Sequence, residues 1–155
     1  MKKLLFIVNV DKFFISHRLP IAVEAIKQGY EVHIATKITG QLNFLEMNGM
    51  IVHPLNLHRS GIISIASEFL EILFLLYRIA PEVVHLVTIK PVIFGGIAAR
   101  LLGSSSVVSA ISGLGFVFID NGFIGKIRKK IVLYLYRIAL NHKNQKIIFQ
   151  NSDDK

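Results

Sequence analysis

The chain contains no cysteine in its 155 residues, and it carries only 10 acidic residues against 18 lysines and arginines. The absence of cysteine excludes a disulfide framework and any chemistry that needs a thiolate. A long uncharged apolar run is also missing. The longest apolar region spans residues 62–80 and is interrupted by Glu68, Glu71 and Arg78. Because charges inside a bilayer are unfavourable, the sequence predicts no membrane-spanning helix.

The N-terminus lacks the marks of a secretory leader. Its apolar stretch is only Leu4 to Val8, charged residues follow at 11 and 12, and no small-residue cleavage site is present. A signal peptide needs a longer apolar segment and such a site. We therefore expect a buried strand at the N-terminus and a cytoplasmic protein.

The segment after this first strand lacks glycine. NAD and FAD are usually bound here by a Gly-x-Gly-x-x-Gly turn, which lets the pyrophosphate approach the backbone. The segment from Asn9 to Ser16 reads Asn-Val-Asp-Lys-Phe-Phe-Ile-Ser. The sequence therefore predicts no dinucleotide cofactor. His33, His53 and His85 lack the spacing of a zinc site, so we also expect no bound metal.

Apolar residues make up 52% of the chain, in short runs that alternate with stretches of helical periodicity. Continuous apolar runs are typical of parallel strands that are buried on both faces. The alternation predicts an α/β fold, a Rossmann-like doubly wound parallel sheet that forms a single domain over residues 1–155. Strands are expected at 3–10, 30–36, 50–54, 83–87, 106–111 and from 146. Helices are expected at 18–28, 41–47, 61–79, 90–102 and 122–141, with a loop at 11–17.

The expected loop after the first strand is polar and aromatic, and it includes Asp11, Phe14 and His17. In an open parallel sheet such loops gather at the carboxyl edge, where ligands bind. Carboxylates and imidazoles bind sugar hydroxyls and aromatic rings stack on sugar faces, so these three residues are candidates for a sugar site. The alternative is a solvated loop in which Phe13 and Phe14 pack into the core.

Two further loops fall at the same edge. Lys90 precedes a helix and, with the N–H groups of that helix, is a candidate for contact with a phosphate; alternatively it is a solvated residue at a helix start. Ser112, Gly113 and Gly115 follow the fifth strand, and glycines open backbone conformations closed to other residues. The apolar residues 116–119 either pack into the core or form an exposed patch.

The net charge is +8, and +6 of it falls within residues 122–155, where eight basic residues face two acidic ones. The last expected helix places Lys126, Arg128, Lys129 and Lys130 beside apolar positions. This pattern is typical of a helix at an anionic membrane surface. A core-facing helix with a solvated basic side has the same pattern. No nucleic-acid motif accompanies the charge, so we expect no nucleic-acid partner.

Four segments, in the same order, resemble the family 4 glycosyltransferases of GT-B fold. Residues 14–33, which contain Ser-His-Arg-Leu-Pro, are similar to the first loop, helix and second strand of that family. Residues 90–103 and 109–118 resemble its bacterial surface-polysaccharide branch, and residues 148–154 resemble the end of its N-terminal domain. The likeness identifies the chain as an N-terminal, acceptor-side domain, with the C-terminal donor-binding domain absent.

The resemblance implies an enzyme that moves a hexose from a nucleotide sugar, expected to be UDP-linked, to a lipid-linked saccharide in surface polysaccharide synthesis (O-antigen of lipopolysaccharide, or capsule). It implies no cofactor and no essential metal. Asp11 or His17 would orient or deprotonate the acceptor hydroxyl, and Lys90 would meet a phosphate. Two departures stand out, because the first loop lacks the family's glycines and Ser112 stands where many relatives have histidine.

The implied partners are the lipid-linked acceptor, an anionic membrane surface, and a donor-binding domain or separate catalytic subunit. Such an enzyme would be cytoplasmic and peripheral to the inner face of the cytoplasmic membrane, and this chain alone would have little turnover. Two alternatives stay open. The chain is a non-catalytic membrane-associated subunit that recruits a separate donor-binding chain, or it is an inactive truncated remnant.

Overall fold

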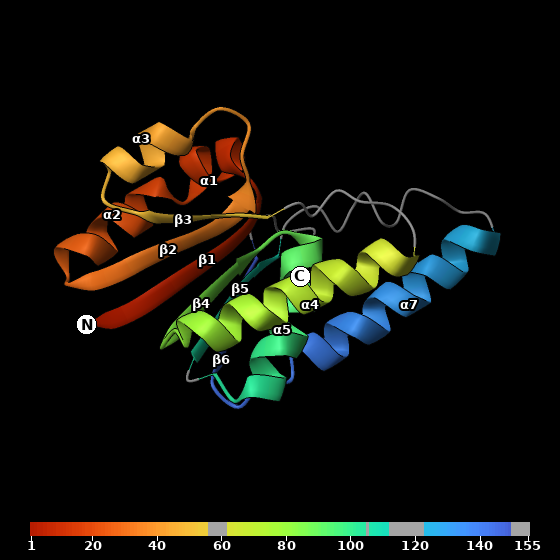
Figure 1. Cartoon of the computed structure of the whole chain (residues 1–155). Coiled ribbons are helices and arrows are strands. Elements are labelled where there is room, and N and C mark those ends of the chain that lie inside the picture. The colour runs from red at the N-terminus through yellow and green to blue at the C-terminus, as the bar shows by residue number, and fades with distance from the viewer. Residues whose placement is uncertain (56–61, 105, 112–122, 150–155) are drawn as a thin grey trace.

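In a computed structural model, the described part of the chain comprises residues 1–55, 62–104, 106–111 and 123–149. The strands are β1 (Lys2–Val10), β2 (Tyr30–Lys37), β3 (Ile51–Pro54), β4 (Val83–Val87), β5 (Ser106–Ile111) and β6 (Gln145–Phe149). The helices are α1 (Asp11–His17), α2 (Leu19–Lys27), α3 (Leu42–Met47), α4 (Ile62–Ile79), α5 (Ile89–Leu102) and α7 (Phe123–Ala139). Figure 1 shows α1, α2 and α3 on one side of the sheet and α4, α5 and α7 on the other.

The strands of the described chain form one parallel sheet in the order β3-β2-β1-β4-β5-β6. The central strand β1 pairs with both β2 and β4, so that Leu5 lies opposite His33 on one side and Val84 on the other. The chain builds outward from β1 to β3, returns to β4, and then builds outward to β6. The predicted doubly wound parallel sheet is confirmed, and its switch point lies between β1 and β4.

The position of β1 explains why its sequence is an unbroken apolar run. Leu4 to Val8 are all buried, because helices cover both faces of the strand. Leu5 and Ile7 pack into a core with residues of α4, α5 and α7. Phe6 and Val8 point the other way, into a second core with residues of α1, α2 and α3. The two cores are therefore joined through the central strand.

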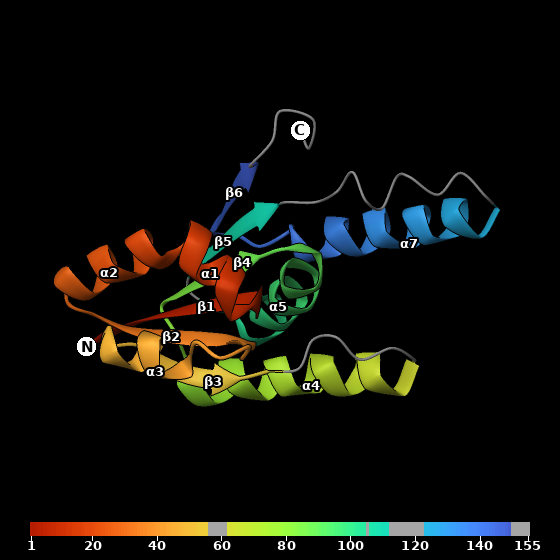
Figure 2. The same cartoon turned by 90° about the horizontal axis from the view of Figure 1, so that it is seen from above.

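Helix α5 packs between α4 and α7, as Figures 1 and 2 show. Two glycines permit this close approach. A methyl group on Gly96 would lie 2.8 Å from the carbonyl oxygen of Ala139 in α7, and one on Gly95 would overlap the Leu86 side chain in β4. The helix ends at Gly103, whose φ of +66° favours glycine. These small residues fix the position of α5, and therefore the point at which its first turn meets the sheet.

Residues 11–17 form the helix α1 and not the expected loop. The helix starts directly after β1, and Phe14 near its middle is fully buried against the sheet. The segment contains neither glycine nor proline, so nothing in it opposes a helical turn. Arg18 then interrupts the helix with φ −128° and ψ −16°, and α2 begins at Leu19 with Pro20 in its first turn. The prediction of a loop was wrong because a short polar segment is equally compatible with a surface helix.

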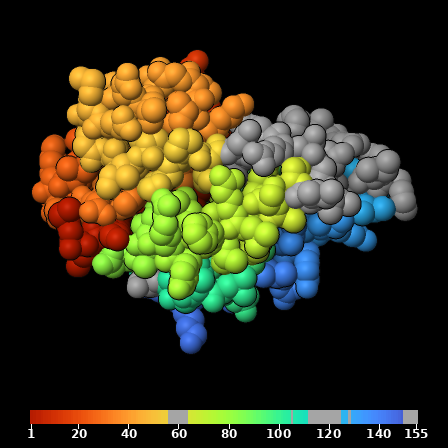
Figure 3. Space-filling model, viewed as in Figure 1, coloured from red at the N-terminus to blue at the C-terminus, as the bar shows by residue number. Residues whose placement is uncertain are grey.

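Several surfaces of the molecule expose large apolar side chains, among them α4 and the edge strand β6. Helix α4 runs across the face seen in Figure 3, with Leu70, Phe74 and Tyr77 exposed on it. At the edge of the sheet, Ile147 and Ile148 of β6 are also exposed. Among the described residues, no helix has both the length and the apolar character needed to cross a bilayer.

Candidate functional site

The carboxyl ends of β1 and β4 meet at the switch point of the sheet. Val8 and Val87 are paired across these strands, so Asn9 and Thr88, the next residues along, are neighbours at this edge. Helix α5 begins at Ile89, and its first backbone N–H groups have no partner within the helix. Open α/β sheets bind ligands at this place, because the chain leaves the two strands in opposite directions.

Thr88 has an unusual backbone conformation, with φ +75° and ψ 168°. For a β-branched residue such a conformation is strained by about 1–3 kcal/mol. Two backbone hydrogen bonds hold it. The Thr88 N–H donates to the carbonyl oxygen of Ala110 at 3.3 Å, and the Thr88 carbonyl accepts from the N–H of Val92 at 3.0 Å. The turn from β4 into α5 therefore takes one residue, and it brings the first turn of α5 directly to the switch point.

Two buried side-chain oxygens at this edge, Asn9 Oδ1 and Thr88 Oγ1, have no hydrogen-bond partner among the residues that the structure describes. Buried polar atoms in native proteins are rarely unpaired, and such an atom calls for water, an ion or a ligand group. An amide oxygen accepts a hydrogen bond, and a hydroxyl both donates and accepts. Together the two side chains can bind a ligand that carries hydroxyl groups.

Lys90 lies two residues after Thr88, in the first turn of α5. Its Nζ is 3.0 Å from Oε2 of Glu68 in α4. The side chain of Lys90 is 38% exposed, whereas that of Glu68 is 1% exposed. The Lys90 side chain is thus partly accessible, whereas the carboxylate that contacts its ammonium is buried. A phosphate here would meet both the ammonium and the positive end of α5.

Asp11 begins α1 at the same edge, but its carboxylate is fully buried and engaged. It accepts hydrogen bonds from the N–H of Lys12 (2.8 Å), the N–H of Thr39 (2.6 Å), the Thr39 hydroxyl and the N–H of Gln41 (3.1 Å). Burial by itself raises the pKa of Asp11, but these hydrogen bonds outweigh burial and hold the pKa below its ordinary value. The contacts make Asp11 an anchor for residues 39–41, and its role as a catalytic base stays a prediction.

Phe14 and His17 occupy opposite environments on α1. Phe14 is fully buried and packs edge to face on Phe6, with ring centroids 5.3 Å apart, so it takes the core position weighed as the alternative for it. His17 is exposed and stacks on the ring of Phe13 at 4.2 Å. Its Nδ1 lies 2.6 Å from the hydroxyl oxygen of Ser16. Of these two predicted residues, the structure leaves His17 accessible to a ligand.

Three of the predicted site residues, Ser112, Gly113 and Gly115, lie outside the described residues, as do the apolar residues 116–119. Strand β5 ends at Ile111 beside β4, so the chain leaves the sheet at the carboxyl edge. The side chain of Arg128 also lies outside the described set.

Sequence reasoning did not identify Asn9, Thr88 or Glu68 as part of this edge. A signal for Glu68 was present, because it shares one face of α4 with Ile72 and Leu76, which are core residues at helical spacing. A charge on an apolar face calls for a partner. Asn9 and Thr88 gave no such signal, since a strained turn and an unpaired oxygen appear only in the folded structure.

Two of the strand histidines, His33 and His53, lie within hydrogen-bond distance of each other. His33 Nδ1 lies 3.0 Å from His53 Nε2, and His33 Nε2 lies 2.8 Å from a carboxylate oxygen of Glu31. Burial, with smaller effects of His33 and Arg78, lowers the pKa of His53. Over the described ranges, no group of three histidine, aspartate or glutamate residues could hold a metal ion.

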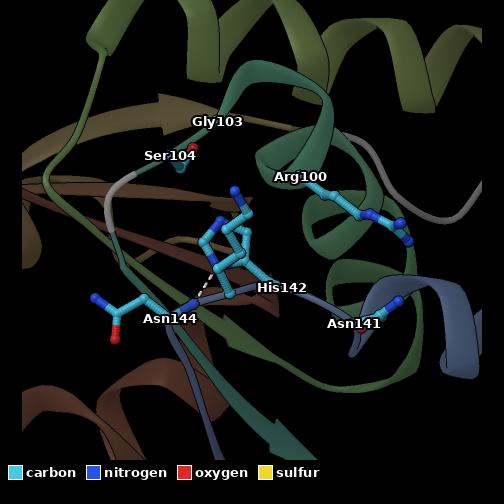
Figure 4. A pocket seen from close by; sticks show the side chains of 7 residues that line it. Arg100, Gly103, Ser104, Asn141, His142 and Asn144 are labelled. Carbon is cyan, nitrogen blue, oxygen red and sulfur yellow. Dashed lines mark hydrogen bonds between the residues drawn. The ribbon is translucent and has the colours of Figure 1, made fainter.

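A pocket of about 690 Å³ lies at the amino edge of the sheet, away from the switch point (Figure 4). It is lined by Arg100, Gly103, Ser104, Asn141, His142, Lys143 and Asn144. Arg100 donates from Nη1 to the carbonyl oxygen of Ile138 at 3.4 Å, and the N–H of Asn144 donates to His142 Nδ1 at 3.1 Å. Cations stabilise the C-termini of helices. The basic residues that line this pocket lie at or just after the C-terminal ends of α5 and α7, and this position accounts for them. None of the predicted site residues that the structure describes contributes to this lining.

The sequence pattern of one protein family, described as glycosyl transferase 4-like, matches residues 3–151. The chain belongs to the glycosyl transferase 4-like family. The match includes every described strand and helix, so the switch-point edge is part of a glycosyl transferase 4-like domain. Its architecture is that of the N-terminal half of a GT-B glycosyltransferase. The predicted resemblance is confirmed at this level.

Curated relatives include two proteins named UDP-N-acetylglucosamine–N-acetylmuramyl-(pentapeptide) pyrophosphoryl-undecaprenol N-acetylglucosamine transferase. The one from Rickettsia canadensis (strain McKiel) is 27% identical over 151 residues, and the one from Rickettsia felis is 26% identical. The first alignment covers 94% of this chain and 40% of the relative. The chain thus spans about two-fifths of the length of these relatives, and they do not single out the surface-polysaccharide branch.

Solved structures share the fold. MurG from Acinetobacter baumannii matches over 98% of this chain and 42% of its own, with a TM-score of 0.63 and 15% identity. A UDP-GlcNAc 2-epimerase from Methanocaldococcus jannaschii matches over 91% of this chain and 41% of its own, with a TM-score of 0.56 and 20% identity. At such identities the likeness shows the fold alone. Because an epimerase shares this glycosyl transferase 4-like architecture, a reaction must be argued from the family and the site.

Proposed function

We propose that this chain supplies the acceptor side of a glycosyltransferase site, which moves a sugar from a nucleotide sugar to a saccharide joined to a lipid through phosphate. The observation that carries the proposal is that polar and basic groups lie together at the switch point of a glycosyl transferase 4-like domain. Asn9 and Thr88 each offer a side-chain oxygen, unpaired within the described part of the chain, to hydroxyl groups. Lys90 and the first turn of α5 offer positive charge to a phosphate.

His17 is the proposed contact to the acceptor hydroxyl. The Ser16 hydroxyl donates its hydrogen to the carbonyl oxygen of Lys12 at 3.0 Å, so its oxygen accepts from Nδ1–H of His17. This assignment of the tautomer leaves the lone pair on Nε2. Nε2 would take the proton of the acceptor hydroxyl as that oxygen attacks the sugar. Stacking on Phe13 would hold the imidazole ring in plane during the transfer.

The proposed donor is a UDP-linked sugar, with N-acetylglucosamine as the first candidate because the curated relatives are named for its transfer. Their names also specify a pyrophosphoryl-undecaprenol acceptor, whereas the sequence resemblance implied a precursor of O-antigen or capsule. Lys90 and the N-terminus of α5 suit the phosphate of either acceptor. A donor-binding half, on the same chain or a separate one, would close over the switch point and complete the site.

Transfer by a complete protein tests the proposal. The chain is joined to the donor-binding half of the Rickettsia canadensis relative and assayed with UDP- and GDP-sugars and a polyprenyl pyrophosphate-linked saccharide. We expect transfer, and a fall of at least about hundredfold in His17→Ala because a general base contributes that much. His142→Ala, which changes a histidine at the opposite edge, is the control. Absence of transfer from every sugar nucleotide would count against the function.

We further propose that α7 contacts an anionic membrane surface, on the face of the membrane where the lipid-linked acceptor is exposed. Helix α7 buries Tyr136 and Ala139, yet Ile127, Ile131 and Tyr134 are exposed. A cavity of about 340 Å³ is lined by Lys126, Ile127, Lys129 and Lys130. Apolar side chains exposed beside lysines suit the headgroup region of a bilayer. Packing into the core alone does not account for the exposed isoleucines.

Pelleting with liposomes measures this membrane contact. We expect the chain to sediment with vesicles that contain anionic lipid and not with neutral vesicles. Reversal of charge at Lys126, Lys129 and Lys130 should abolish sedimentation. Reversal at Lys2, Lys27 and Lys143, which lie elsewhere on the surface, removes the same net charge and is the matched control. Equal sedimentation with both lipid compositions would contradict the proposal.

The alternative of a non-catalytic subunit is supported by the exposed apolar side chains of α4, Leu70, Phe74 and Tyr77. Such a surface suits a partner protein as well as a lipid. Complementation separates the two functions. If this chain is a non-catalytic subunit, its His17→Ala variant should still restore transfer when it is mixed with a separate donor-binding chain. If it is the acceptor-side domain of an enzyme, the same variant should not restore transfer.

A further inference from the structure

Glu68 is a carboxylate on the buried face of α4, with 1% of its side chain exposed. Its neighbours on that face, Ile72 and Leu76, belong to the hydrophobic core. An ionised carboxylate loses its hydration in such a place, and an apolar residue of similar volume is often as stable or more stable there. Stability alone therefore does not account for a glutamate at position 68.

The contact between Glu68 and Lys90 compensates two unfavourable placements. Lys90 lies in the first turn of α5, where a positive charge opposes the helix dipole. The 3.0 Å contact between Lys90 Nζ and Glu68 Oε2 offsets this repulsion and also the burial of the carboxylate. As a result, the ammonium of Lys90, which lies two residues after Thr88 in the first turn of α5, is held by a fixed partner.

The helices that carry the two residues are themselves fixed relative to each other. Phe69 of α4 and Phe94 of α5 pack edge to face, with ring centroids 6.2 Å apart and an interplanar angle of 81°. Phe69 follows Glu68 directly, and Phe94 lies one helical turn after Lys90. The carboxylate is thus presented by a rigid surface, which is the property that a positioning group needs.

We propose that Glu68 is the positioning residue for Lys90, and that it holds the ammonium in place for the phosphate part of a ligand at the switch point. The inference rests on the proposed function, because it takes Lys90 as the phosphate contact. Glu68 itself does not touch the ligand. Without Glu68, the flexible four-carbon stem of Lys90 loses its 3.0 Å ion pair and has more freedom to give up at each binding event, and this lowers affinity.

The sign of the effect separates positioning from simple electrostatics. Removal of a negative charge beside an anion site strengthens anion binding by Coulomb's law. Positioning predicts the opposite, that Glu68→Gln weakens it. Glu68→Asp also separates positioning from electrostatics, because it keeps the negative charge but moves the carboxylate away from Lys90 by the length of one methylene group. Positioning predicts weaker binding in both variants, whereas an electrostatic role predicts a change in Glu68→Gln only.

The test uses the chain as it is, with inorganic pyrophosphate as the probe. Lys90 is modified by an amine-selective reagent, and its rate of modification is followed by peptide mass spectrometry at increasing pyrophosphate. In Glu68→Gln we expect about threefold or faster modification without pyrophosphate, and about threefold to tenfold more pyrophosphate for half-protection. Glu71→Gln changes an exposed carboxyl on the same helix and should match the wild type. Circular dichroism confirms that each variant is folded.

Each outcome separates the inference from the proposed function. If both Glu68 variants need as much pyrophosphate as the wild type, or less, the positioning role is overturned while Lys90 remains a phosphate contact. If pyrophosphate does not protect Lys90 in the wild type, the phosphate contact and the role of Glu68 are both overturned. Sugar transfer by the joined protein is measured independently of either result. If Glu68→Gln does not fold, the comparison of Glu68→Asp with Glu71→Gln decides the question.

Discussion

Among single residues, Asp11 makes contacts that should contribute measurably to the free energy of unfolding. Its carboxylate accepts four hydrogen bonds, three of them from residues 39–41. Asp11→Asn keeps the shape but turns an NH₂ group toward these donors, so we expect a loss of about 2–3 kcal/mol in the free energy of unfolding. Urea denaturation measures it, with the exposed Glu46→Gln as the control. Unchanged stability in Asp11→Asn would argue for the catalytic role instead.

His85 makes stability depend on pH. Burial, and then the charge of Arg18, lower its pKa to about 4, whereas the pKa of histidine in an unfolded chain is about 6.5. Between these values the unfolded state binds a proton that the folded state does not, so stability falls as the pH drops through this window. We expect this group to remove about 2 kcal/mol between about pH 7.5 and about pH 5. His85→Phe should lose correspondingly less in denaturant titrations at the two pH values, and equal losses would refute the assignment.

The site could be predicted from the sequence only in part. Asp11 and Lys90 each follow an apolar strand closely, and the order of strands and helices was enough to assign them to the carboxyl edge. Their partners were not predictable in this way. The carboxylate of Asp11 meets Thr39 and the ammonium of Lys90 meets Glu68, and both contacts join segments that are 22 or more residues apart. Such contacts depend on how the helices pack on the sheet, which the local sequence does not determine.

At the scale of elements, glycine and proline marked most boundaries. Gly29, Gly49 and Gly103 all have positive φ and lie within two residues of the end of a strand or helix. The predicted bounds agree with the observed ones within two residues for the described elements from α2 to β6. The segment 11–17 was different. Its helical form depends on the burial of Phe14 against the sheet, which is a tertiary effect that local sequence does not record.

The contact between α5 and α7 offers a test at the scale of elements. Gly96→Ala places a methyl group 2.8 Å from the Ala139 carbonyl oxygen, and backbone cannot rotate away as a side chain can. We expect a loss of about 1–3 kcal/mol in the free energy of unfolding, because overpacking forces the helices apart. Leu101→Ala, at an exposed position of the same helix, should change stability by less than about 0.5 kcal/mol. Thermal and urea unfolding measure both, and a neutral Gly96→Ala would show that α7 does not pack as described.

For the whole molecule, the switch point is the feature that connects folding to function. The chain leaves β1 toward one edge of the sheet and β4 toward the other, so the segments after these strands diverge and a ligand can reach the backbone between them. This arrangement forms one wall of a site. The relatives are about two and a half times as long as the matched region, and their remaining length is where a second wall is to be sought.

The order of the strands predicts a gradient of local stability across the sheet. β1 is paired on both sides and covered on both faces, so its amides exchange only when both hydrophobic cores open. β6 is paired only with β5 among the described strands, and Ile147 and Ile148 are exposed on it. Hydrogen exchange followed by mass spectrometry should therefore find the slowest exchange in residues 4–8 and much faster exchange in residues 145–149. Equal protection of the two strands in the isolated chain would mean that another surface covers β6, and dilution of the protein would then show whether that surface belongs to a second copy.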